Sequence, residues 1–297
     1  MELLHFLESI RSPFLDVLVG FITRFGEETI AIVIICVIYW CLNKRLAYGI
    51  GIAYFLSGLT VQGMKISFRV DRPWIADPTL NPVPSALEHA TGYSFPSGHT
   101  QGAAALLGSI GAQIKRIPLQ VTCFTLAILV AFSRLYLGVH TLQDVAVSLL
   151  ITALIIFITV KFFIPKDIDK KRELLLLIGM IFYAVIIITT AAILYSNGTI
   201  EQIYLTDCLK AAGACIGFAT GMYVERIYIC FSTKTKSLVL QFIKFIIGIA
   251  GVLLIKEGLK LIIGTGLVVD TVRYFLILIW MTVGFPLIIK RFFQAPS

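Results

Sequence analysis

The feature that most constrains this chain is a succession of long apolar runs separated by short charged segments. A membrane-spanning helix needs ~20 mostly apolar residues. Runs close to that length cover residues 28–43, 46–65, 98–114, 117–134, 141–163, 173–195, 208–230, 237–257 and 270–290. Only 14% of the 297 residues are charged, against ~25% in soluble domains. The sequence therefore predicts an all-α, polytopic membrane helix bundle.

A shorter apolar segment, 13–25, precedes these runs and contains Asp16 and Arg24. Three interpretations stay open for it: a first span, a re-entrant piece or an interfacial helix. The chain is accordingly expected to cross the membrane nine or ten times.

The net charge of +8 does not indicate nucleic-acid binding, because the cations form no stripe with interleaved aromatic residues. They cluster instead in alternate loops, as expected for cytoplasmic loops. These basic loops hold Lys44-Arg45, Lys115-Arg116, Lys166 to Arg172, Arg226 with Lys234 and Lys236, and Lys290-Arg291. The other set comprises Glu27-Glu28, the proline-rich segment 66–97, the 135–140 turn, 196–207 and 258–270, and is predicted to face the non-cytoplasmic side.

The sequence "PSGH", from Pro96 to His99, begins one of the apolar runs on that second side. It predicts a helix start with Ser97 as the N-cap. Gly98 lets a ligand approach the backbone, and a helix N-terminus attracts anions. An ordinary capped helix start is the plainer interpretation, and Gly98 with Gly102 is also typical of small-residue helix packing.

A second cluster is "SRLYLGVHTLQD", from Ser133 to Asp144. His140 and Asp144 lie four residues apart at the start of a predicted helix and therefore share a face. The carboxylate can hold one imidazole nitrogen and leave the other as a base or nucleophile. A structural hydrogen bond is the alternative. Arg134 adds a cation just upstream.

The segment "KISFRVDRP" adds Lys65 and Arg72 on the same side. Five cationic or titratable groups then gather there: Lys65, Arg72, His99, Arg134 and His140. Charge at membrane depth costs ~2.5–3.5 kcal/mol per group, so such groups are functional by default. Nearby aspartates are too few to neutralise them. A phosphate is the partner that Arg and Lys donors around a helix N-terminus suit best.

These three segments, Lys65-x6-Arg72-Pro73, Pro96-Ser97-Gly98-His99 and Ser133-Arg134-x5-His140-x3-Asp144, resemble the three-part signature of the type 2 phosphatidic acid phosphatase superfamily, in its order. The resemblance covers about residues 1–165 and implies a six-helix phosphatase core. Residues 166–297 carry no part of the signature and are expected to form about four additional transmembrane helices of unknown role.

The resemblance implies a role for each motif residue. His140 would be the nucleophile that forms a phosphohistidine, Asp144 would orient it, and His99 would be the general acid and base. Phosphate binding would fall to Lys65, Arg72, Ser97, Gly98 and Arg134. The family uses no metal, and no cofactor is implied.

The expected function is hydrolysis of a lipid phosphate or pyrophosphate at the outer face, with undecaprenyl pyrophosphate as the first candidate. Phosphatidylglycerophosphate and phosphatidate are close alternatives. A lipid phosphotransferase using the same residues, or a lipid carrier with a phosphate-binding site, also stays open.

Three further features are interpreted structurally. The six cysteines form no CxxC pair and are expected to be core residues. Gly213, Gly217 and Gly221 predict a helix-packing face, either onto the core or in a homo-oligomer. Glu88 and His89 are expected to be a solvated loop pair.

Overall fold

The computed structural model describes residues 1–88, 90–164 and 169–294, and in this part of the chain it contains helices and no strand. The predicted all-α fold class is therefore confirmed. His89 and part of the basic loop at 166–172 lie outside the described residues.

The helices follow one another in the order α1 (Glu2–Ser9), α2 (Pro13–Thr23), η1 (Arg24–Gly26), α3 (Glu28–Val37), η2 (Ile38–Leu42), α4 (Lys44–Phe68), α5 (Pro73–Ala76), α6 (Pro84–Leu87), α7 (Gly98–Ala103), η3 (Ala104–Gly108), α8 (Ser109–Gln113), α9 (Ile117–Tyr136), α10 (Leu142–Ile158), η4 (Thr159–Phe163), α11 (Lys170–Ser196), α12 (Gln202–Val224), η5 (Glu225–Ile229), α13 (Leu238–Leu253), η6 (Leu254–Gly258), α14 (Leu259–Ile263), α15 (Leu267–Ile279), η7 (Trp280–Gly284), α16 (Phe285–Ile288) and η8 (Ile289–Phe293).

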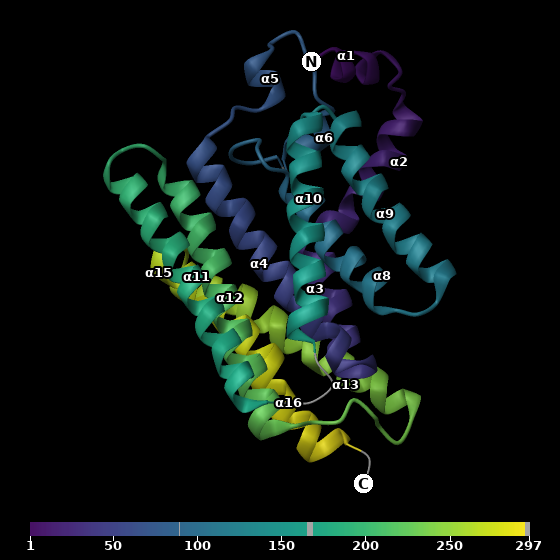
Figure 1. The fold of residues 1–297 in the computed structure, drawn as a ribbon, viewed down its shortest axis with the longest axis vertical. Helices are drawn as coiled ribbons and strands as arrows, with labels where there is room; N and C mark the ends of the chain where they lie inside the picture. The colour runs from purple at the N-terminus through teal and green to yellow at the C-terminus, as the bar shows by residue number, and fades with distance from the viewer. Residues whose placement is uncertain (89, 165–168, 295–297) are drawn as a thin grey trace.

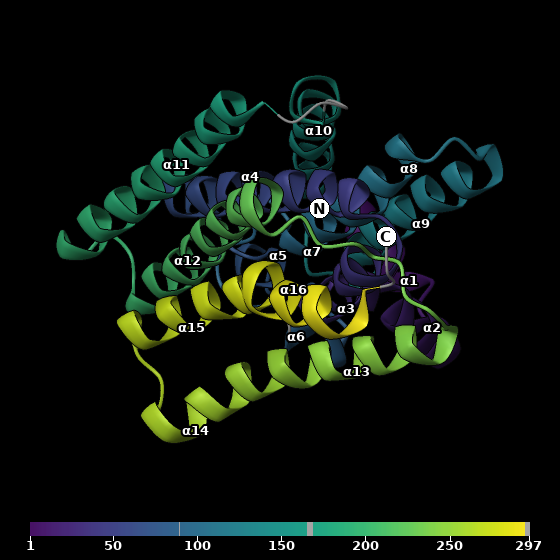
Figure 2. The same ribbon diagram turned by 90° about the horizontal axis from the view of Figure 1, so that it is seen from below.

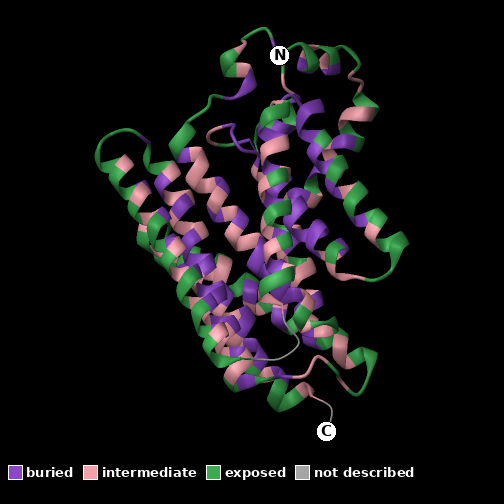
Figure 3. Cartoon of the chain, viewed as in Figure 1, coloured by how far each residue is buried: buried purple, intermediate pink, exposed green. Residues whose placement is uncertain are grey.

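Among the described residues, six helices are long and apolar enough to cross a membrane, or seven if the bent pair at the N-terminus is one span. This is fewer than the nine or ten crossings expected from the apolar runs. The helix from α7 to α8 is too short to count as a membrane span. Helix α12 is long enough, but its small residues together with Asp207 and Lys210 make it insufficiently apolar. Large apolar side chains such as Leu175, Phe182 and Phe242 are exposed on the outside, as expected for surfaces that face lipid (Figure 3).

The bent pair comprises Pro13–Gly26 and Glu28–Leu42, which meet at 55°. The N-terminal helix α1 lies at the same end of the molecule as the 66–97 segment (Figure 1), where the His5 Nε2 and Asp77 Oδ2 atoms are 2.9 Å apart. Glu27 and Glu28, expected in a loop, lie at the bend and line a cavity. Glu27 is half-buried and Glu28 is exposed, so the bend places this acidic pair on the cavity wall.

Helix α4 is the element that joins the two halves of the molecule. It packs against α7 and α10 on the N-terminal side and against α11 and α12 on the other side. We call the helices from α11 to η8, residues 170–293, the C-terminal extension. Figure 2 shows α4 and α12 side by side, with α15 next to α12. The extension is therefore built directly onto a helix that carries part of the predicted site.

At the end opposite the predicted site, buried polar contacts attach the extension to the core. The fully buried carboxylate of Glu225 accepts a hydrogen bond from Lys44 Nζ at 2.7 Å and one from the Tyr48 hydroxyl. The Trp40 indole N–H donates to the carbonyl of Met281 at 2.9 Å. These contacts fix the register between α4 and the extension, because a buried charge must keep its partner.

Gly213, Gly217 and Gly221 lie on one face of α12, and this face packs against other helices of the same chain. A Cβ at Gly213 would come within 2.5 Å of the Thr271 carbonyl oxygen, and one at Gly217 within 2.6 Å of the Phe275 carbonyl oxygen. Gly221 packs against the side chain of Thr282 in η7. This face therefore packs against other helices of the extension, which corrects the expected packing onto the core. A homo-oligomer stays a prediction.

Candidate functional site

The eight residues predicted for the site come together at one end of the bundle, although they span residues 65 to 144. Lys65 lies near the end of α4, Arg72 precedes α5, and the Ser97–His99 turn begins α7. Arg134 closes α9, His140 lies in the loop after it, and Asp144 is in the first turn of α10. Two backbone-mediated contacts hold α7 to α10: Ser97 N–H donates to the Asp144 carbonyl at 3.2 Å, and the Ser148 hydroxyl donates to the Ser97 carbonyl at 2.8 Å.

The sharp turn between α9 and α10 is what presents His140. Gly138 adopts a φ of 75°, a left-handed conformation that glycine accommodates without strain. Thr141 then begins α10 in a capping box, in which its side chain and that of Asp144 satisfy each other's backbone N–H groups. The Thr141 N–H donates to Asp144 Oδ2 at 2.8 Å. Asp144 is thus fixed by the helix start itself.

His140 and Asp144 are both 2% exposed and face each other. His140 Nδ1 lies 3.4 Å from Asp144 Oδ2, and the Ser94 hydroxyl donates to that same oxygen at 2.6 Å. Arg72 NH1 lies 3.0 Å from His140 Nε2. A guanidinium can only donate, so we assign the tautomer with a proton on Nδ1 and a lone pair on Nε2. Burial lowers the pKa of the His140 imidazole, and the positive charges of Arg72 and Arg134 act in the same direction. The neutral imidazole is the form that can attack an electrophile.

Arg72 is held in place by backbone carbonyl groups. Its guanidinium donates to the carbonyls of Gly92 at 2.8 Å, Thr91 at 2.7 Å and Val139 at 3.0 Å. These acceptors carry no formal charge. The positive charge of Arg72 therefore stays available to an anion at the site.

Lys65 and Arg134 approach from two other helices. Lys65 Nζ donates to the Tyr93 carbonyl at 2.7 Å. Arg134 is 1% exposed and donates from NH1 to the Thr23 hydroxyl at 2.8 Å. Its Nε and NH2 atoms are buried and have no hydrogen-bond partner among the described residues. Because a buried donor without an acceptor is costly, these atoms point to a missing anionic ligand.

His99 and Gly98 line the cavity together with His140, Arg72 and Lys65. Apart from its chain neighbours, no atom of the described residues lies within 4 Å of the position that a Cβ at Gly98 would take, so the start of α7 is open to a ligand. The backbone of His99 is packed against Gly26, where a Cβ would come within 2.6 Å of the His99 carbonyl oxygen. The N-terminal bend therefore positions this histidine.

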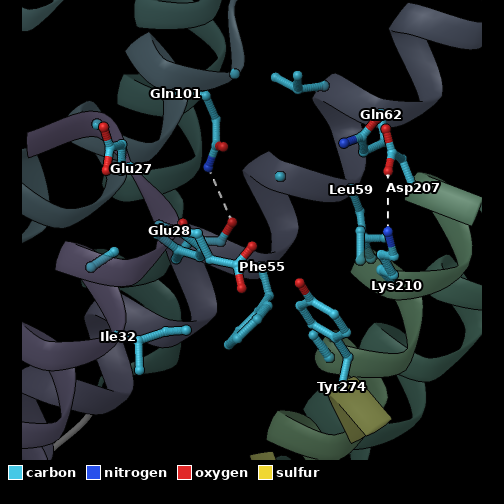
Figure 4. Close-up of a pocket in the computed structure, with 18 of the residues that line it drawn as sticks. Glu27, Glu28, Ile32, Phe55, Leu59, Gln62, Gln101, Asp207, Lys210 and Tyr274 are labelled. Carbon is cyan, nitrogen blue, oxygen red and sulfur yellow. Dashed lines mark hydrogen bonds and ion pairs between the residues drawn. The ribbon is translucent and has the colours of Figure 1, made fainter. Parts of the chain in front are cut away.

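The cavity that begins at these residues has a volume of about 620 Å³ and extends between the core and the C-terminal extension. Next to these residues it is lined by polar side chains from the start of α3 and from α4, α7, α12 and α15 (Figure 4). We call these the polar belt; its members are Glu27, Glu28, Gln62, Gln101, Asp207, Lys210 and Tyr274.

The sequence interpretation missed Thr23 and the polar belt. Thr23 lies in a segment whose position was left open, and a single hydroxyl carries no signal. Asp207 and Lys210 did carry a sequence signal, because two charged residues near the start of a long helix in a membrane protein indicate function. Asp207 was instead assigned to the loop 196–207, and Lys210 to the apolar run 208–230 with no role. Glu88 also lines the cavity, whereas its predicted partner His89 lies outside the described residues.

Two family models match the chain. The PAP2 superfamily model matches residues 46–168, and the model of the PAP2 superfamily phosphatase transmembrane extension matches residues 209–297. Two curated relatives come from Bacillus subtilis (strain 168). Phosphatidylglycerophosphatase B is 28% identical over 178 residues, covering 54% of this chain and 79% of the relative. Undecaprenyl-diphosphatase BcrC is 27% identical over 184 residues, covering 58% and 84%. No solved structure matches.

Replacing Arg134 with Met is expected to weaken the binding of orthovanadate, a phosphate analogue, at least tenfold. Hydrogen bonds to charged groups contribute ~1.5–3 kcal/mol, and ~1.4 kcal/mol corresponds to a factor of ten. Isothermal titration of the purified protein measures this affinity. Arg69→Met is the matched control, because Arg69 is an exposed arginine at the same end. Equal affinity in wild type and Arg134→Met would show that Arg134 does not contact the anion.

Proposed function

The chain belongs to the PAP2 superfamily, and we propose that it hydrolyses a lipid phosphate or diphosphate through a phosphohistidine formed on His140. One observation carries this proposal. His140 presents Nε2 to Arg72 while Asp144 faces Nδ1, so the imidazole is oriented and lies next to a guanidinium group.

In the first step, the Nε2 lone pair of His140 attacks the terminal phosphorus, and the bond from phosphorus to the leaving oxygen breaks. The Nδ1–H bond to Asp144 stabilises the positive charge that develops on the ring. His99 donates a proton to the leaving oxygen. The products of this step are the phosphohistidine and either a lipid alcohol or a lipid monophosphate.

In the second step, water attacks the phosphohistidine, and His99 accepts the proton that the water loses. The N–P bond breaks, inorganic phosphate leaves, and His140 returns to its neutral form. The same histidine thus acts as acid and then as base, which requires no additional proton donor.

The phosphoryl oxygens would be held by Lys65, Arg72 and Arg134, together with Ser97 and the Gly98 N–H. These groups provide positive charge and donors in a buried site, where such interactions are strong and need little rearrangement. Since the three cations supply the positive charge that a phosphoryl group needs, we propose that hydrolysis needs no metal ion.

Undecaprenyl pyrophosphate is the first candidate substrate. Embedding the site among membrane helices suits a substrate whose tail stays in lipid, and one relative is an undecaprenyl-diphosphatase. Phosphatidylglycerophosphate is the second candidate, because the other relative is a phosphatidylglycerophosphatase.

We further propose that the site faces the non-cytoplasmic side. Basic residues gather at the other end, where Arg45 donates to the Ile164 carbonyl at 2.7 Å and Lys44 pairs with Glu225. Positively charged loops mark the cytoplasmic face of membrane proteins.

This orientation predicts opposite labelling of two cysteines by a membrane-impermeant maleimide. Native Cys230 is exposed at the basic end, and Ser85 is exposed at the site end. In intact cells, Ser85→Cys in a Cys230→Ser background should be labelled, whereas native Cys230 should react only after permeabilisation. The reverse pattern would overturn the proposed orientation.

Purified protein is expected to release inorganic phosphate from polyprenyl or glycerolipid phosphates in the presence of excess EDTA. Orthovanadate should inhibit the reaction, because it occupies the phosphoryl position. A malachite-green screen across undecaprenyl pyrophosphate, phosphatidylglycerophosphate and phosphatidate measures the release and ranks the head groups. Loss of all activity in EDTA that Mg²⁺ restores would contradict the metal-independent mechanism.

A further inference from the structure

The cavity beyond the polar belt follows the axes of four helices. On α12 its lining residues are Tyr204, Asp207, Lys210, Ala211, Ala214 and Phe218, which recur every three or four positions and so form one helix face. On α4 the lining residues recur in the same way from Ala47 to Lys65. Faces of α3 and α15 complete the walls. Because the lining residues recur along these helix faces, the cavity runs along the helices and away from His140 and Lys65.

The lining changes from polar to apolar along this path. Gln62 lies about one helical turn before Lys65 on α4, so the polar belt begins ~5 Å from the catalytic residues. Lys210 is held there by Asp207 at 3.8 Å and by Asp270 at 4.0 Å. Farther along, the lining includes Ile32, Ile35, Phe55, Phe218, Ile277, Leu278 and Met281. We call this apolar part the tail chamber.

Aromatic side chains narrow the tail chamber between α12 and α4. The ring of Phe218 packs on Phe55 with centroids 4.9 Å apart and also contacts Gly51. A single aromatic ring therefore closes the gap between α12 and α4 at this level.

We propose that the leaving group of the substrate lies in this cavity, with its tail between the phosphatase core and the C-terminal extension, and that the chamber selects single-chain lipids over two-chain lipids. The polar belt contacts the polar part of the leaving group next to the phosphoryl group, and the tail chamber takes the first part of the hydrocarbon. The extension thus forms one wall of the cavity and helps to determine which lipids fit. This inference rests on the proposed phosphatase activity.

The test compares three substrates that carry the same head group. This head group is a monophosphate or a diphosphate, whichever the phosphate-release screen shows to be the better substrate. Their organic parts are isopentenyl (short), geranylgeranyl (one long chain) and dioleoylglycerol (two chains). Wild type should show a kcat/KM for the geranylgeranyl substrate at least tenfold above that for the dioleoylglycerol substrate in mixed micelles.

Two variants change the chamber in opposite directions. Ala214→Phe fills it and should lower the geranylgeranyl-to-isopentenyl ratio of kcat/KM at least tenfold. Phe218→Ala widens it and should raise the rate with the two-chain substrate relative to the single-chain one several-fold. Ala192→Phe is the control, since Ala192 is exposed on the lipid-facing side of α11. Vanadate binding reports that each variant has folded.

The outcomes separate the two proposals. If wild type releases phosphate from none of the lipids, the proposed function itself is wrong. If it hydrolyses them but both variants leave the substrate ratios unchanged, or the two-chain lipid is preferred by wild type, the activity stands and the tail chamber is overturned.

Discussion

The arrangement of the site depends on three cations that form no salt bridge with a carboxylate among the described residues. Lys65, Arg72 and Arg134 meet at one end of the bundle, and their hydrogen bonds go to carbonyl groups, a hydroxyl and, for Arg72, the His140 Nε2 atom. The carboxylate of Asp144 is already engaged by Ser94 and by its own helix start. Burying cations this way is unfavourable unless an anion completes the site. A phosphoryl group satisfies both the charge and the orphaned donors of Arg134.

The same charge distribution explains why His140 suits nucleophilic attack. Two guanidinium groups and a buried setting oppose protonation of the imidazole, while Asp144 fixes which nitrogen keeps its proton. The phosphoryl group would then be held by the cations that keep the histidine neutral. Binding and activation therefore come from one set of side chains, contributed by α4, α9, α10 and the loops between them. The extension contributes through Tyr204 of α12, whose ring stacks on the ring of Tyr93 with centroids 4.1 Å apart. The carbonyl group of Tyr93 in turn accepts the hydrogen bond from Lys65.

Much of the site was predictable because its residues lie in short segments with strong local signals. The i, i+4 spacing of His140 and Asp144 and the Ser97 helix start predicted geometry that the structure contains. Apolar run lengths predicted most helices to within a few residues. Contacts between distant segments were not predictable: Thr23 reaching Arg134, the position of Glu27 and Glu28 on the cavity wall, and the packing of Gly213 on α15 all depend on how helices cross. Periodicity identifies a helix face, but it does not identify the partner of that face.

The measurement that tests the account most directly is trapping of the covalent intermediate. The protein is mixed with substrate labelled with ³²P in the terminal phosphoryl group, quenched in alkali and digested for mass spectrometry. The account predicts an alkali-stable, acid-labile phosphohistidine at His140. Turnover without any labelled intermediate, or label on a residue other than His140, would contradict it.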